Sequence, residues 1–188
     1  MKKIFFILFS LIIIFTFISA RKAEKINSNF NQSTIEIKEV TPFVYCSIHH
    51  QGPYSDIETI MKQLMMASRS QNIFPGGPLI GIYHNSPNQV KPANLEWEIG
   101  FPVTPQVLPQ PPLEKKQWNF TLVVSTIHVG SYEKAGDTIA KMEEWMKANG
   151  LAPVGPLLER YLTMPTPETK PENLKTEIWI PCQKQLDL

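Results

Sequence analysis

The side chains with the clearest capacity for chemistry lie near the C-terminus, in the run from Lys175 to Cys182 that reads KTEIWIPC. Residues of one parity share a face of a β-strand, so Glu177 and Trp179 point to the same side. A carboxylate beside an indole suits a flat organic cation, which gains a charge pair and a cation–π contact. We therefore expect Glu177 and Trp179 to form the floor of a ligand-binding cleft. The alternative is a solvated Glu177 beside a core Trp179.

Two further residues extend this candidate site. Tyr161 lies on the strand predicted just before this run, where its ring could form a second aromatic wall or its hydroxyl could contact the ligand. Glu98 holds the place of Glu177 in the first half of the chain, but Gly100 stands where the second half has Trp179. Glu98 is therefore the weaker candidate, at the rim of the pocket or on the surface.

Tyrosine and histidine residues surround two glycine turns. Tyr54 and Tyr132 follow these turns at the entrances of predicted helices, where they could shape the mouth of a cleft or pack the start of the helix. His50 and His128 precede the same turns, and neutral imidazole is the commonest metal ligand. Because no neighbouring Asp or Cys completes a coordination set, we expect the histidines to stabilise turns, with no metal and no resident cofactor.

These residues recur because the chain carries an internal repeat. The pattern His-x-Gly-x-Tyr at 50–54 returns at 128–132, an offset of 78 residues, and Gly-Pro-Leu at 77–79 returns at 155–157. Further along, Glu-Ile at 98–99 matches Glu-Ile at 177–178 at an offset of 79, which one inserted loop residue explains. So many matches at one spacing indicate a duplication.

Each half predicts the same order of elements, β-α-β-β. Runs rich in Val, Ile, Phe and Tyr indicate strands, and apolar residues at i, i+3, i+4 and i+7 indicate a helix with one buried stripe. We expect strands at 43–50, 79–84, 95–101, 120–129, 157–163 and 175–180, and helices at 57–65 and 135–146. One such unit cannot cover both faces of its sheet. The predicted fold is therefore α+β: two tandem β-α-β-β modules related by a pseudo-twofold axis, with antiparallel sheets and a central ligand cleft.

The N-terminal residues and the region between the two modules differ in composition from the rest of the chain. Residues 1–20 combine two lysines, an apolar run and a small residue at the end, which predicts a signal peptide and export to the periplasm or the medium. An uncleaved membrane anchor is the alternative. Residues 21–34 read as a flexible spacer, and 35–182 as the folded domain. Its modules span about 35–103 and 118–182, joined by a proline-rich connector at about 102–117.

The overall charge argues against some functions. The 188 residues carry 18 Lys and Arg against 17 Asp and Glu, a formal net charge of +1, so we expect no binding to nucleic acid. After removal of the leader we expect no stable insertion into a membrane. The two cysteines, Cys46 and Cys182, are too few for a cysteine-based zinc site, but they could form a disulfide in an exported chain.

An ordered set of motifs resembles a known family. The set consists of HVGSYEKAGDTIAKMEEWMKANGL, GPLLERYL and TEIWIP, preceded by a degenerate first copy, and it covers nearly all of residues 35–181. It is similar to the gyrase-inhibitor-like (GyrI-like), or AraC effector-binding, small-molecule-binding domains. The resemblance implies two β-α-β-β modules with a ligand cleft between them. It also implies an acidic residue at the cleft floor in the last strand, where Glu177 matches.

Three functions follow as expectations. The first is an exported binding protein for a small hydrophobic or cationic molecule. The second is a hydrolase in which Glu177 acts as a general base and Tyr161 donates a proton, because a carboxylate in an apolar cleft has a raised pKa. The resemblance also implies this second function, because some relatives hydrolyse strained small molecules. The third is haem binding through the repeated histidines.

Overall fold

A computed structural model describes residues 34–163, 166 and 168–185. The predicted signal peptide and all but the last residue of the predicted spacer lie outside these residues. No helix in the described part of the chain is both long and apolar enough to cross a bilayer. The strands are β1 (Glu36–Glu39), β2 (Phe43–Gln51), β3 (Ile80–Tyr83), β4 (Glu96–Pro102), β5 (Glu114–Trp118), β6 (Leu122–Val129), β7 (Leu151–Pro153), β8 (Leu157–Tyr161) and β9 (Lys175–Lys184). The α-helices are α2 (Ile57–Ser70) and α3 (Ala135–Ala148), and single 3-10 turns precede both of them and β4 and β9.

The strands form one antiparallel sheet in the order β1-β6-β9-β8-β3-β4-β2-β5, and β7 pairs with β9 outside this path. Strands β2, β3 and β4 of the first half form one side of the sheet and β6, β8 and β9 of the second half form the other, and the two halves meet where β3 pairs with β8. The α+β class and the antiparallel sheet predicted from the sequence are confirmed. The duplication itself stays an inference from the sequence repeat.

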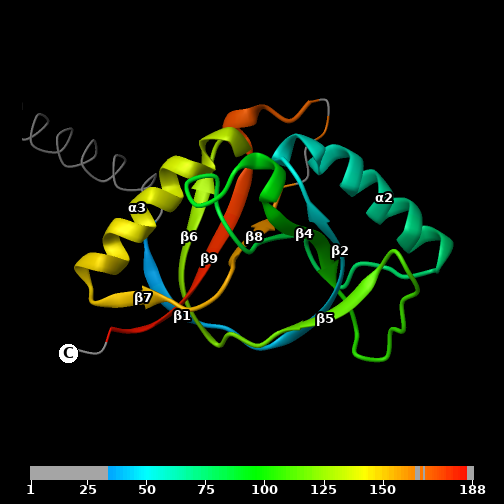
Figure 1. Ribbon diagram of the computed structural model, residues 1–188, viewed down its shortest axis with the longest axis horizontal. Helices are drawn as coiled ribbons and strands as arrows, with labels where there is room; N and C mark the ends of the chain where they lie inside the picture. The colour runs from blue at the N-terminus through cyan, green and yellow to red at the C-terminus, as the bar shows by residue number, and fades with distance from the viewer. Residues whose placement is uncertain (1–33, 164–165, 167, 186–188) are drawn as a thin grey trace, which may run out of the picture. The chain divides into compact units, whose positions relative to one another are not determined.

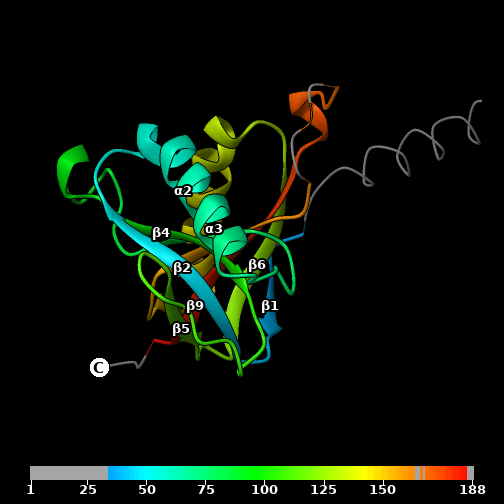
Figure 2. The same cartoon turned by 90° about the vertical axis from the view of Figure 1, so that its right-hand side faces the viewer.

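Both helices cover the same face of the sheet, which we call the helix face (Figures 1 and 2). Each helix buries a stripe of residues spaced by four: Ile60 and Leu64 in α2, Met142 and Met146 in α3. Both helices are followed by a residue with positive φ, Asn72 and Gly150, which turns the chain back toward the sheet.

The register of the strands fixes which residues share the helix face. Paired residues of neighbouring antiparallel strands point to the same side, so one row can be followed across six strands. In sheet order this row is Thr126, Ile178, Glu159, Gly81, Ile99 and Ile48. Glu159 and Gly81 form the central pair, at the junction of the two halves.

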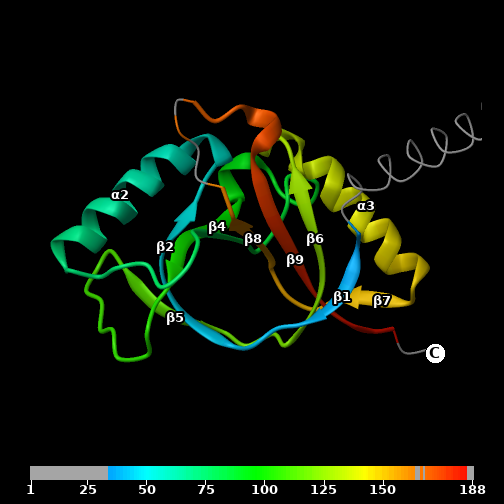
Figure 3. The same cartoon turned by 180° about the vertical axis from the view of Figure 1, so that it is seen from behind.

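The strands that precede each half are exchanged between the halves. β1 precedes β2 in the chain but pairs with β6, and β5 precedes β6 but pairs with β2 (Figures 1 and 3). β5 corrects the predicted connector at 102–117, because its last part is a strand. Its sequence, EKKQW, lacks apolar alternation since it lies at a sheet edge with most of its residues partly or fully exposed.

The two cysteines do not form a disulfide with each other. Both thiols are free and buried. Cys46 on β2 packs in the core under α2, whereas Cys182 on β9 packs in the core under α3. The two side chains therefore belong to separate apolar clusters in the two halves of the sheet.

Candidate ligand-binding site

A pocket of about 750 Å³ opens on the helix face between α2, α3 and the central strands. Its walls are largely apolar, as is usual for sites that take up small organic molecules. The apolar side chains from α2 are Ile57 and Met61, and Ile139 comes from α3. The sheet adds Leu157 and Ile180. We call this cavity the central pocket.

One buried carboxylate, Glu159 on β8, stands at the sheet side of the central pocket and is only 8% exposed. Its Oε2 atom accepts hydrogen bonds from the hydroxyls of Tyr161, at 3.0 Å, and Tyr83, at 3.2 Å. The two phenol oxygens are themselves 2.8 Å apart. Within the described residues no hydrogen bond reaches the other carboxylate oxygen, Oε1, which is thus available to a ligand.

Gly81 makes this convergence of oxygens feasible. It pairs directly with Glu159 across β3 and β8. A Cβ atom at Gly81 would lie 2.8 Å from the hydroxyl of Tyr161 and 2.9 Å from that of Tyr83, closer than such atoms approach in proteins. The side chain that is missing on β3 therefore provides the space in which both phenols reach the carboxylate of β8.

Two further tyrosines complete the aromatic walls. Tyr54 packs edge-on against Tyr83, and Tyr132 packs edge-on against Tyr161, with ring centroids 5.4 Å apart in each pair. The hydroxyls of the outer two tyrosines point to backbone carbonyls of Asn85 and Thr163. The outer rings therefore fix the inner rings, whose hydroxyls contact the acid.

The charge of the central pocket is negative. Its acidic side chains are the buried Glu159 and, from the 3-10 turn before α3 and from α3 itself, the exposed Glu133 and Glu143. In the part of the chain that the structure describes, no lysine or arginine lines it. Burial raises the pKa of Glu159, although the phenol hydrogen bonds and the nearby His128 act in the opposite direction. A buried acid without a basic partner in an apolar cavity is a natural position for a cationic ligand, which supplies the charge partner when the acid ionises.

The residues predicted from the sequence divide between the two faces of the sheet. Tyr54, Tyr132 and Tyr161 line the central pocket. Glu177 and Trp179 do not, because the register pairs Arg160 with Glu177 and Leu158 with Trp179. These side chains point away from the helices. The expectation that this pair forms the floor of the cleft is therefore corrected.

Glu177 is already neutralised on that opposite face. Lys38 donates a hydrogen bond of 2.6 Å to its Oε1, and Arg160 forms an ion pair with its Oε2. Burial by itself raises the pKa of Glu177, but Lys38, the neighbouring indole of Trp179 and Arg160 together outweigh it and lower the pKa. The indole of Trp179 is occupied as well, with the Arg160 guanidinium 4.8 Å from its ring centre. Both partners proposed for a ligand cation thus have partners within the protein.

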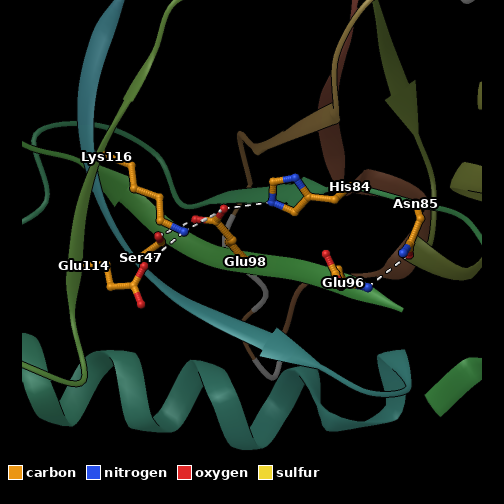
Figure 4. Close-up of polar contacts among 7 residues, drawn as sticks. All are labelled: Ser47, His84, Asn85, Glu96, Glu98, Glu114 and Lys116. Carbon is orange, nitrogen blue, oxygen red and sulfur yellow. Dashed lines mark hydrogen bonds and ion pairs between the residues drawn. The ribbon is translucent and has the colours of Figure 1, made fainter. Parts of the chain in front are cut away.

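Glu98 occupies the equivalent position in the first half, and it too lies outside the residues that line the central pocket. Figure 4 shows its polar contacts. Its side chain is 2% exposed and accepts hydrogen bonds from Ser47, at 2.6 Å, and His84, at 2.8 Å. Lys116, on the exchanged strand β5, lies 3.1 Å away. Burial by itself raises the pKa of Glu98, but these three partners lower it to about 2.

The repeated histidines stabilise the turns next to them. His50 Nε2 lies 2.9 Å from Asp56, beside the first turn. His128 Nε2 donates to the carbonyl of Ser131, and its Nδ1 forms a second hydrogen bond with the hydroxyl of Thr138. No group of three His, Cys, Asp or Glu side chains within the described residues is arranged to hold a metal ion.

Sequence reasoning missed Glu159 although a signal for it was present. The repeat aligns Gly81 with Glu159 between matching Gly-Pro-Leu and Tyr residues, at the same offset of 78. Strand parity places Glu159 on the face of Tyr161, the tyrosine already proposed for the cleft. Glu159 could therefore have been predicted as a site residue, because it is an acid where the first half has glycine and it shares a face with Tyr161.

Comparison with known proteins agrees with this fold. Residues 33–183 match the GyrI-like small molecule binding domain, and the chain belongs to this family. No curated protein sequence matches the chain significantly. The membership defines the class as a small-molecule-binding domain, as the sequence resemblance implied.

Three solved structures illustrate the likeness. The C-terminal domain of EcmrR has a TM-score of 0.70 and 18% identity, over 81% of this chain and 98% of that one. A hydrolase from Listeria innocua has a TM-score of 0.59 and 16% identity, over 85% and 98%. SAV2435, bound to tetraphenylphosphonium, has a TM-score of 0.54 and 9% identity, over 80% and 94%. At these identities the likeness shows the fold alone.

Proposed function

We propose that this domain binds a hydrophobic organic cation in the central pocket, with Glu159 as the charge partner and the tyrosine rings as aromatic walls. The observation that carries the proposal is the position of Glu159: a buried carboxylate in an apolar pocket that no lysine or arginine of the described chain lines. The aromatic rings around it add cation–π contacts. The tetraphenylphosphonium bound to SAV2435 supplies a suitable probe.

The expected contribution of Glu159 can be worked out from Coulomb's law. A delocalised cation about 6 Å from the carboxylate, at an effective dielectric constant of about 20, gains roughly 3 kcal/mol. Loss of that charge in Glu159→Gln should therefore weaken binding of tetraphenylphosphonium by about 100-fold. The measurement is a calorimetric titration at about pH 8, where protons compete with the cation for the carboxylate less than at lower pH.

Glu177→Gln is the matched control, because it makes the same change on the opposite face. It should leave the dissociation constant close to that of the parent protein. Equal affinities of Glu159→Gln and the parent would refute the charge partner. Loss of binding in Glu177→Gln alone would place the ligand on the opposite face.

A hydrolase in the same pocket is the second candidate. Its support is the raised pKa of Glu159 together with the Tyr161 hydroxyl at 3.0 Å, a pair that can move a proton. Glu177 lacks this support because its pKa is lowered. Incubation with strained or activated small electrophiles distinguishes the candidates: product formation that Glu159→Gln abolishes supports the enzyme, and saturable binding without product supports the binding protein.

We also propose that the domain acts outside the cytoplasm. The support is the sequence of residues 1–20, with its basic start and apolar run. N-terminal sequencing of protein from a cell fractionation would test this. A mature chain that begins near residue 21 supports export with cleavage, a membrane-bound chain that keeps residue 1 supports the anchor, and an intact chain among soluble cytoplasmic proteins refutes both.

A further inference from the structure

We propose that Glu159 carries a proton in the ligand-free protein and that an incoming cation takes the place of this proton, so that the central pocket exchanges one for the other. This inference rests on the proposed function and adds the chemistry by which the site is regulated.

The oxygen atoms around Glu159 form three contacts of hydrogen-bond length, but an ionised acid leaves only two hydrogens to fill them. Its Oε2 and the hydroxyl oxygens of Tyr83 and Tyr161 form a triangle with sides of 2.8, 3.0 and 3.2 Å. All three sides are within hydrogen-bond distance, and each needs one hydrogen. The phenols supply two, and an ionised carboxylate supplies none. One side would then bring two oxygen lone pairs together, whereas a proton on Oε2 closes a complete ring of three hydrogen bonds.

The phenols themselves cannot resolve this shortage. Burial raises the pKa of both Tyr83 and Tyr161 well above the ordinary value, so each keeps its single hydrogen. They also cannot easily move apart, because Tyr54 and Tyr132 pack edge-on against them. Gly81 leaves the space that the two hydroxyls fill. The triangle is therefore maintained by packing on both sides.

Few other groups could hold Glu159 ionised. The titratable groups that face it are Tyr83 and Tyr161 beside it, Tyr54 and Tyr132 behind them, His128 on β6, Glu133 in the turn before α3, Glu143 on α3 and His84 after β3. His128 already uses both ring nitrogens, toward the Ser131 carbonyl and the Thr138 hydroxyl, and no hydrogen bond joins it to Glu159 within the described residues. His84 donates to Glu98. The two acids on the α3 side oppose a second negative charge.

The exchange balances in charge and in atoms. The acid Oε2–H bond breaks, its proton leaves to solvent, and the carboxylate that remains pairs with the cation. Because Oε1 has no hydrogen-bond partner within the described residues, the cation can approach that oxygen while the phenols stay on Oε2. The affinity for a cation should therefore fall as the pH falls.

Tetraphenylphosphonium is a suitable probe because it has no group that titrates, so every proton released comes from the protein. We expect calorimetric titrations in two buffers of different ionisation enthalpy to show release of up to one proton per bound cation, at pH values below the pKa of ligand-free Glu159. Across about pH 4.5 to 8, the dissociation constant should rise by up to about tenfold for each pH unit below that pKa.

Two variants make the test specific. Glu159→Gln removes the titrating group, and its residual binding should release no proton and should not depend on pH. Glu144→Gln changes an exposed acid of α3 that does not line the central pocket, and it should behave as the parent does. Thermal unfolding of each variant confirms that it is folded under the conditions of the titration.

The outcomes separate this inference from the proposed function. Tight binding with a constant affinity and no proton release overturns the exchange but leaves the cation site in place. Proton release that persists in Glu159→Gln also overturns it, because another group would then be the donor. Absence of binding at every pH overturns the proposed function itself.

Discussion

Replacement of Glu98 by glutamine should destabilise the domain and reduce its sensitivity to acid. Glu98 is 2% exposed, and Ser47, His84 and Lys116 contact its carboxylate, so the folded protein lowers its pKa from 4.5 to about 2. Each pKa unit between folded and unfolded chain is worth about 1.4 kcal/mol, which gives roughly 3 kcal/mol of stability near neutral pH.

The sign of the pH dependence follows from the direction of this change. Because the folded protein binds the proton on Glu98 more weakly than the unfolded chain does, the stabilisation is complete above pH 4.5. It is lost as the pH falls from there toward about 2. Glu159 contributes with the opposite sign: its raised pKa means that its contribution is lost as the pH rises above 4.5 toward the folded value.

The assay is chemical denaturation of the parent and Glu98→Gln at about pH 7 and about pH 3. Near pH 7 the variant should lose on the order of 3 kcal/mol in the free energy of unfolding, and the difference should shrink at the lower pH. Glu96→Gln is the matched control, since Glu96 is exposed on the same strand. Equal stability of parent and Glu98→Gln near pH 7, or an unchanged difference in acid, would refute the reasoning.

Three further predictions concern other parts of the domain. Glu177→Gln should destabilise the fold by about 1–3 kcal/mol in denaturation experiments, because it removes a buried carboxylate that pairs with two partly buried cations, yet it should retain cation binding. Loss of both would contradict the placement of Glu177 away from the pocket. Gly81→Ala should weaken tetraphenylphosphonium binding at least tenfold in calorimetry, because the Cβ of the alanine displaces the hydroxyls of Tyr83 and Tyr161. The variant should still unfold cooperatively. Unaltered affinity would count against the contacts of these hydroxyls with Glu159. Cys46 and Cys182 should react with a thiol reagent only in denaturant, since both are buried and burial raises the pKa of both thiols; rapid reaction of the native protein would be inconsistent with this.

The elements of the fold were accessible to sequence reasoning because they depend on local patterns. The stripe containing Ile60 and Leu64 predicted α2, and the β-rich runs predicted the six strands that form the middle of the sheet. The sequence did not predict β5 because this strand lies at the edge of the sheet, where most of its side chains are partly or fully exposed. Its sequence therefore shows no alternation of apolar and polar residues. β1, only four residues long, is largely exposed for the same reason.

Pairing between strands was less accessible because it depends on contacts distant in the sequence. The exchange of β1 and β5 between the halves places Lys38 beside Glu177 and Lys116 beside Glu98. No local pattern around these four residues indicates such partners. Without them, both glutamates looked like charges in need of a ligand.

By itself the sequence predicted a cleft with an acid and aromatic rings between two similar halves, and it named Tyr54, Tyr132 and Tyr161 among the candidate residues, but it chose Glu177 as the acid. Only the tertiary structure decided which acid faces the helices. Parity shows which residues of β9 share a face, but both faces of this strand are buried, so burial does not reveal which face turns toward α2 and α3. The register between β8 and β9 does: it turns Glu177 toward Arg160 and leaves Glu159 in the central pocket.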